Sequence, residues 1–182
     1  MDQSKLLWKT HQKKKIFQNK YLGLRNDEVI RPDGESGKYI VIENRDFVDV
    51  FCRTPDRKFL MVYQYRYPWQ QFSWEPPAGI IEPDKDRSPE EAAQREVEEE
   101  TGYKVVSLEK LAQVHPFAMC AGWAHIFYAE VSPKGHQKLD PGEFLQFEEK
   151  TWEEVDQLIL RGEFLHGMAR LGWEIIKQRH LS

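Results

Sequence analysis

The alternation of apolar and polar positions predicts a chain built mainly from strands. β-Branched and aromatic residues alternate with polar ones over residues 21–30, 39–43, 47–53, 58–66, 74–79, 105–117, 123–131 and 144–148. Apolar residues recur with helical spacing after Thr151 and over 164–179. Residues 1–20 are basic and polar, which predicts a solvated strand or a frayed arm. This order of elements indicates an α+β or sandwich-like layering.

One internal helix, over residues 89–101, has clear signals at both ends. Ser88 is placed as its N-cap, Pro89 at the first helical position, and Glu91 at the third position, where it can complete a capping box. Gly102 follows the last turn, where a left-handed residue is favoured. The helix therefore has a fixed start and end, which sets the spacing of its charged side chains.

Three carboxylates share one face of this helix. Glu96, Glu99 and Glu100 are spaced i, i+3 and i+4, so their like charges repel unless a cation compensates them. Carboxylate oxygens are the ligands that Mg²⁺ or Mn²⁺ takes, and Arg95 lies where it can orient Glu99. A solvated acidic surface helix is the alternative that the spacing alone leaves open.

Composition narrows the class of protein. With 182 residues the chain suits one domain, with or without a small appendage. A net charge of −4 argues against nonspecific nucleic-acid binding, and no apolar run is long enough to cross a membrane. The first residues lack the apolar stretch of a secretory signal, and Cys52 and Cys120 form no disulfide framework. We therefore expect a cytoplasmic protein.

Residues 79–103 resemble the Nudix box, Gly-x5-Glu-x7-Arg-Glu-U-x-Glu-Glu-x-Gly-U, in which U is apolar. The match runs over Arg95-Glu96-Val97 to Glu99-Glu100 and Gly102-Tyr103, with Gly79 two residues too early. Arg87 stands where the pattern has its first Glu, so Asp84 or Asp86 is expected to replace that carboxylate. The resemblance implies a Nudix fold: a mixed β-sheet between helices, in α/β/α layers.

Further short elements resemble the ADP-ribose and nucleoside-diphosphate-sugar pyrophosphatases of that superfamily. They are Gln64-Tyr65-Arg66, Glu75-Pro76-Pro77-Ala78-Gly79, Pro32-Asp33-Gly34 and Arg161-Gly162-Glu163. The resemblance implies that the Ala78 carbonyl binds metal beside Glu96, Glu99 and Glu100. Arg66 offers a planar fork of donors suited to a diphosphate, although an ion pair is the alternative for a strand arginine.

Further residues are candidates for substrate binding and catalysis. Arg53 is a further candidate for substrate binding, and Tyr21, with Phe17 or Trp8 as alternatives, is a candidate for stacking on a base. The family often takes its base from a loop after the central strands, where this chain has Glu143, with Asp140 second. Glu99 and Glu100 are also candidates for a catalytic role. Residues 115–122 differ from the corresponding loop of ADP-ribose enzymes, so the resemblance does not fix the sugar.

These observations predict an enzyme. The expected reaction is Mg²⁺-dependent (or Mn²⁺-dependent) hydrolysis of a nucleoside diphosphate sugar, such as ADP-ribose or GDP-mannose, to a nucleoside monophosphate and a sugar phosphate. Two alternatives stay open: a hydrolase of oxidised nucleoside triphosphates or dinucleoside polyphosphates, and a non-catalytic nucleotide-sugar sensor. Residues 1–46 are expected to form a β-rich appendage that joins a homodimer, and residues 47–182 the catalytic domain.

Overall fold

The computed structural model describes residues 1–133 and 135–180. Two compact units are present. The first contains Met1–Arg45 and His115–Trp123, and the second contains the rest of the chain. The prediction had placed residues 115–123 in the catalytic domain, whereas their contacts belong to the N-terminal unit.

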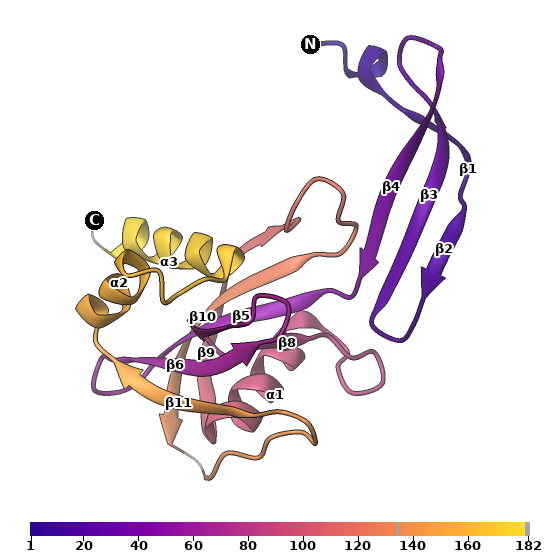
Figure 1. Ribbon diagram of the computed structural model, residues 1–182. Helices are drawn as coiled ribbons and strands as arrows, with labels where there is room; N and C mark the ends of the chain where they lie inside the picture. Colours follow the sequence, from indigo (N-terminus) through magenta and orange to yellow (C-terminus); the bar gives the residue numbers. More distant parts are fainter. Residues whose placement is uncertain (134, 181–182) are drawn as a thin grey trace. The chain divides into compact units, whose positions relative to one another are not determined.

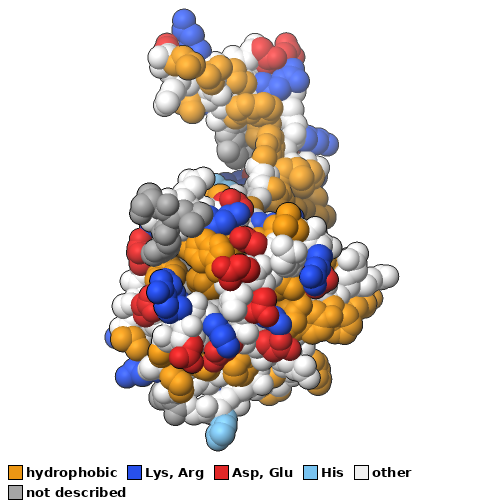
Figure 2. Space-filling model, turned by 90° about the vertical axis from the view of Figure 1, so that its left-hand side faces the viewer, with side chains coloured by type: hydrophobic (Ala, Val, Ile, Leu, Met, Phe, Trp, Pro, Cys, Tyr) orange, Lys and Arg blue, Asp and Glu red, His pale blue; other side chains and the backbone are white. Residues whose placement is uncertain are grey.

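The N-terminal unit is an antiparallel sheet around one long strand. Its elements are η1 (Gln3–Leu6), β1 (Lys9–Gln12), β2 (Lys15–Gln18), β3 (Leu22–Ile30) and β4 (Ser36–Asn44). Both β1 and β2 pair with β3 on one side, and β4 pairs with it on the other. The basic segment 1–20 therefore contributes two short strands and a 3₁₀ turn. Several hydrophobic side chains of this unit are exposed, and Figure 2 shows some of them.

Residues 115–123 are joined to the first unit through the end of β4. Ile42 forms a bridge with Cys120, and the side-chain oxygen of Asn44 accepts hydrogen bonds from Gly122 N (3.2 Å) and Cys120 Sγ (2.6 Å). A Cβ atom on Gly122 would lie 2.6 Å from the Asn44 carbonyl oxygen. Only glycine fits so close an approach.

The second unit is a seven-stranded mixed sheet between helices. Its strands are β5 (Phe47–Arg53), β6 (Phe59–Arg66), β7 (Gln71–Glu75), β8 (Ala78–Ile80), β9 (Tyr103–Val114), β10 (Ala124–Pro133) and β11 (Leu145–Lys150). The order is β11-β6-β5-β10-β9, with β7 beside β6 and β8 beside β5. Among the described strands of this sheet, β10 and β5 form the one parallel pair. The helices are α1 (Pro89–Thr101), α2 (Trp152–Leu160) and α3 (Gly167–His180).

Helices cover both faces of this sheet (Figure 1). On one face α1 packs Ala92, Ala93 and Val97 against strand residues such as Val48 and Val50. On the other face α2 and α3 enclose an aromatic core in which Trp173 contacts Phe59 edge-on, with ring centroids 4.8 Å apart. The predicted α+β class and its α/β/α layers are confirmed. No helix among the described residues is long and apolar enough to span a bilayer.

The sheet opens at one end, because β5 and β6 pair only at Arg53 and Phe59. Beyond that point β5 pairs with β8, and β6 pairs with β7. A single strand was predicted over 74–79, but Pro76 and Pro77 lack N–H donors and separate β7 from β8. The opening between the two strand pairs lies at the end of the sheet where Ala78 and Arg66 are found.

The last helix begins later than predicted, at Gly167 rather than residue 164. The preceding residues bond to β7 instead: Trp74 N donates to the Glu163 carbonyl (2.8 Å), and Leu165 N donates to Ser73 Oγ (3.0 Å). These bonds hold the segment before α3 against the open end of the sheet.

Candidate active site

Helix α1 begins and ends as the sequence predicts. The Ser88 side chain accepts a hydrogen bond from Glu91 N (3.3 Å), and Gly102 is left-handed with φ of 72°. The capping box is incomplete, because the Glu91 carboxylate binds the backbone N and the guanidinium of Arg87 instead of Ser88 N. Arg87 is exposed and lies outside the carboxylate cluster, so it supplies no charge to the site.

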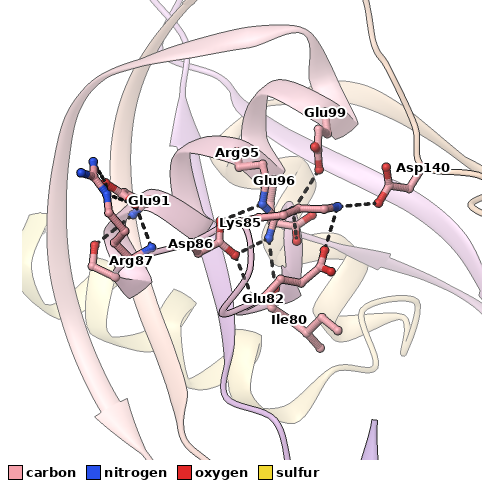
Figure 3. A network of polar contacts seen from close by, with 11 residues as sticks. Ile80, Glu82, Lys85, Asp86, Arg87, Glu91, Arg95, Glu96, Glu99 and Asp140 are labelled. Atoms are coloured by element: carbon pink, nitrogen blue, oxygen red, sulfur yellow. Dashed lines mark hydrogen bonds and ion pairs between the residues drawn. The ribbon is translucent and has the colours of Figure 1, made fainter. Parts of the chain in front are cut away.

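Arg95 organises the carboxylates at the start of the site (Figure 3). Its Nε and one Nη donate to the two oxygens of Asp86, each at 2.8 Å. The other Nη donates to Glu96 (2.8 Å) and Glu99 (2.9 Å). Asp86 is buried and also accepts from Glu82 N (2.8 Å), whereas Asp84 is exposed. Of the two candidates for the missing box Glu, Asp86 is therefore the one that contacts Arg95, and its replacement of that Glu stays a prediction.

Glu96 and Glu100 face β8. Glu100 accepts a hydrogen bond from Ala78 N (3.0 Å), and the Glu96 carboxylate lies where a Cβ atom on Gly79 would be, 1.9 Å away. Burial, helped by Glu99 and Glu143, raises the pKa of Glu96 to about 7 despite Arg95. Burial and the charge of Glu96 raise the pKa of Glu100 well above its ordinary value. Both carboxylates would gain from a nearby cation.

The carboxylate cluster fits a divalent metal ion by its chemistry. Its donors are carboxylate oxygens, and two of them, on Glu96 and Glu100, are buried, where a cation would favour their charged forms. Over residues 1–133 and 135–180, no three His, Cys, Asp or Glu side chains converge as a finished ligand set. In this arrangement Glu96 and Glu99 bond to Arg95, and Glu100 bonds to Ala78 N. The Ala78 carbonyl as a ligand stays a prediction.

Arg66 extends from β6 towards the same opening. Its Nε donates to both oxygens of Glu75, at 3.1 and 3.2 Å, and the Glu75 side chain is fully buried. Burial lowers the pKa of Arg66, but Glu75, together with the charges of Glu100 and Asp49, raises it overall. The ion pair and the diphosphate role are thus compatible, because Glu75 fixes a guanidinium that is still about one-third exposed (36%).

Glu143 lies in the loop before β11, close enough to raise the pKa of both Glu96 and Glu100. Its carboxylate accepts from Asp140 N (3.0 Å), and Asp140 in turn binds Lys85 (3.2 Å). Glu143 also lines a pocket of about 420 Å³ with Tyr63, Phe72, Leu139 and Phe144. The structure therefore brings the predicted base and the helix carboxylates into one neighbourhood.

Of the other two predicted substrate residues, Arg53 belongs to the same unit as this cluster but lies at a distance from it along β5. Arg53 ends β5 opposite Phe59, while Ala78 lies opposite Asp49, four residues earlier and so about 13 Å along the strand. Arg53 lines a separate pocket with Asp56–Lys58 and Thr151–Glu153, and its substrate role stays a prediction. Tyr21 belongs to the N-terminal unit, where its exposed ring lies under the Lys20 ammonium (4.5 Å), and its stacking role stays a prediction.

Asp49 and His166, which were not among the predicted site residues, lie close to Arg66 and Ala78. His166 Nδ1 is 3.4 Å from Asp49 Oδ1. A lone aspartate inside the apolar run Phe47-Val48-Asp49-Val50-Phe51 was a usable signal, because a charge in a buried strand needs a reason. His166 carried no comparable signal.

The mixed sheet between helices, with the Arg95–Glu100 helix at its open end, defines the Nudix class of domain. The Nudix domain family matches residues 43–172, and the nucleoside diphosphate sugar hydrolase N-terminal domain matches residues 8–42. The chain belongs to the Nudix family and is a Nudix hydrolase, as the sequence predicts.

Curated relatives of similar length support this assignment. The chain is 35% identical over 157 residues to an ADP-ribose pyrophosphatase of Bacillus subtilis (strain 168), covering 83% of this chain and 82% of that protein. It is 34% identical, with the same coverage, to a methanol dehydrogenase activator of Bacillus methanolicus. The solved structure of an ADP compounds hydrolase has the same fold, with a TM-score of 0.79 at 16% identity over 94% of this chain and 92% of that one.

Proposed function

We propose that this enzyme hydrolyses the diphosphate bond of nucleoside diphosphate sugars, such as ADP-ribose or GDP-mannose. The products are a nucleoside monophosphate and a sugar phosphate, and the cofactor is Mg²⁺ or Mn²⁺. The observation that carries the proposal is that Arg66 lies close enough to the α1 carboxylate Glu100, at the open end of the sheet, for each charge to shift the pKa of the other. The N-terminal match and the relative that is an ADP-ribose pyrophosphatase support the substrate class.

Each protein group has a part in the proposed reaction. Arg66, held by Glu75, binds the diphosphate and offsets its charge. Glu96, Glu99 and Glu100, together with the Ala78 carbonyl, would hold the divalent metal, whose charge would offset that of the diphosphate and lower the pKa of the attacking water. Glu143 accepts the proton of that water as it attacks one phosphorus atom, and the other phosphate group departs.

We also propose that the protein works as a cytoplasmic homodimer. Exposed hydrophobic side chains of the N-terminal sheet, including Ile16, Phe17, Tyr39 and Ile40, suit a second copy of the chain. Cys52 and Cys120 are unpaired and buried, which suits a reducing compartment. Size-exclusion chromatography with light scattering tests the dimer, and a species of 21.6 kDa would refute it.

Product analysis tests the reaction. The purified enzyme is incubated with Mg²⁺ and ADP-ribose, GDP-mannose, ADP-glucose, UDP-glucose, a dinucleoside polyphosphate or 8-oxo-dGTP, and the products are separated by chromatography. Nucleoside monophosphate and sugar phosphate are expected from the sugar diphosphates. Turnover of only the triphosphate or polyphosphate would contradict the substrate class, and turnover of none would favour a nucleotide-sugar sensor.

A further inference from the structure

A second pair of charges lies at the open end of the sheet, outside the metal cluster. Asp49 has a fully buried side chain, and no hydrogen-bond donor of the described residues reaches either of its oxygens. Leaving a buried carboxylate without hydrogen bonds is unfavourable by several kcal/mol unless a cation lies close by. The arrangement around Asp49 therefore requires a physical explanation.

The side chain that forms an ion pair with Asp49 when protonated is His166, immediately before α3. Its Nδ1 atom lies 3.4 Å from Asp49 Oδ1, an ion-pair distance without a hydrogen bond. The ring is flanked by Phe47 and Trp69, with centroids 5.9 and 6.4 Å away. Nδ1 is buried, whereas the side chain as a whole is 22% exposed, so solvent reaches atoms of this side chain other than Nδ1.

Asp49 and His166 both lie next to residues that are proposed to bind the substrate or the metal. Asp49 is the register partner of Ala78 across β5 and β8, and its charge acts on Arg66. Trp69, which flanks His166, belongs to the turn that follows Arg66. Burial lowers the pKa of His166, but the carboxylates of Asp49 and Glu75 outweigh both burial and the charge of Arg66, so the pKa is raised.

We propose that His166 is a second cationic contact for the diphosphate, donating from Nε2 beside Arg66 while Asp49 holds the ring from its buried side. This inference rests on the proposed function, because it names a further residue that binds the same substrate. Phe47 and Trp69 restrict the ring, so the donor is oriented before substrate arrives. A charge without hydrogen bonds at Asp49 is tolerated because it keeps a cation at the edge of the site.

Two substitutions of His166 test its two ring nitrogens separately. In His166→Asn the side-chain amide can replace Nδ1 near Asp49 but cannot reach the position of Nε2. In His166→Gln the amide reaches the position of Nε2 and leaves Asp49. The exposed His136 of the same unit supplies the control His136→Asn. Calorimetric titration with α,β-methylene-ADP in Mg²⁺ measures binding without turnover, and steady-state kinetics on the best substrate gives KM and kcat separately.

We expect His166→Asn to raise the dissociation constant and KM about tenfold to a hundredfold, the effect of losing a hydrogen bond to a charged group. His166→Gln should show a smaller rise, because a neutral donor is about half as strong as a charged one. His136→Asn should bind like the wild type. A purely structural role for His166 predicts lower thermal stability of both variants with unchanged binding by the folded protein.

Unchanged affinity in folded His166→Asn would overturn the inference. If that variant does not fold, His166→Gln decides the question, since an affinity equal to that of the wild type would also overturn the inference. The binding titration needs no turnover, so it tests ligand binding independently of hydrolysis. Wild-type enzyme that hydrolyses no sugar diphosphate refutes the proposed function, while equal affinities refute only the role of His166.

Discussion

Replacing Asp86 by Asn should destabilise the second unit and leave its fold intact. Asp86 is 6% exposed and accepts two hydrogen bonds of 2.8 Å from Arg95. Asn keeps one acceptor and loses the charge, while Arg95 retains Glu96, Glu99 and the Ile80 carbonyl. One charge-assisted bond is therefore lost, which amounts to about 2 kcal/mol. For a chain of this length that lowers Tm by about 4–8 °C.

The effect should also depend on pH. Burial raises the pKa of Asp86, but the bonds from Arg95 and Glu82 N outweigh it, and the pKa is lowered overall. A carboxylate with a lowered pKa in the folded state stabilises the protein above its unfolded value of about 3.9. That contribution disappears as pH falls through the folded pKa. The stability difference between wild type and Asp86→Asn should therefore be constant near neutrality and shrink below about pH 4.

Urea and thermal unfolding followed by circular dichroism measure both effects. The matched control is Asp84→Asn, because Asp84 lies in the same loop, is exposed, and carries the same charge. The control should unfold within about 0.5 kcal/mol of the wild type, as surface substitutions usually do. Equal stability of the two variants at pH 7, or a difference that persists unchanged at pH 3.5, would show that Asp86 does not anchor Arg95 as a carboxylate.

Three further substitutions test the site by activity. Glu100→Gln should lower kcat at least about a hundredfold in a folded protein, since it removes a charge from the metal cluster; near-normal turnover would contradict this. Glu143→Gln should also lower kcat about a hundredfold with little change in KM, whereas the exposed Glu148→Gln should not. Gly79→Ala places a Cβ 1.9 Å from Glu96 and should raise the Mn²⁺ concentration needed for activity, whereas the uncrowded Gly167→Ala should not.

Local signals made several elements predictable to the residue. Helix α1 spans Pro89–Thr101 as predicted, because Ser88 and Gly102 satisfy its end groups within the chain itself. Strand β5 spans Phe47–Arg53 as predicted, because a run of β-branched and aromatic residues is bounded by polar ones. Where the stabilising contacts are near in sequence, the pattern of residues determines the element.

Elements that depend on distant contacts were less predictable. The segment before α3 contains helical spacing, but its N–H and carbonyl groups bond to β7, which delays the helix to Gly167. Residues 115–123 group with the first unit because Asn44 binds Cys120 and Gly122. Neither partner is near in sequence, so periodicity could not reveal the competition.

In the active site too, residues set by local sequence were predictable, whereas those set by distant contacts were not. The three carboxylates were predictable because one helix spaces them, and Asp86 was one of two expected replacements for the missing box Glu. Choosing between Asp84 and Asp86 required the fold of the loop, which turns Asp86 towards Arg95 and Glu82 N. The position of Arg53 relative to the carboxylate cluster required the fold for a related reason. The sequence does not tell which end of β5 lies at the opening of the sheet, and Ala78 pairs with the opposite end.

Asp49 and His166 show why charged residues in apolar strands should be examined first. The neighbours Val48 and Val50 point to the α1 core, so alternation places Asp49 on the α3 face, where Phe51 packs on Trp173. A carboxylate on that face needs a cation from the elements that cover it. The cation comes from the segment that β7 holds in place before α3. Sequence can thus predict that Asp49 has a partner, while only the fold identifies His166.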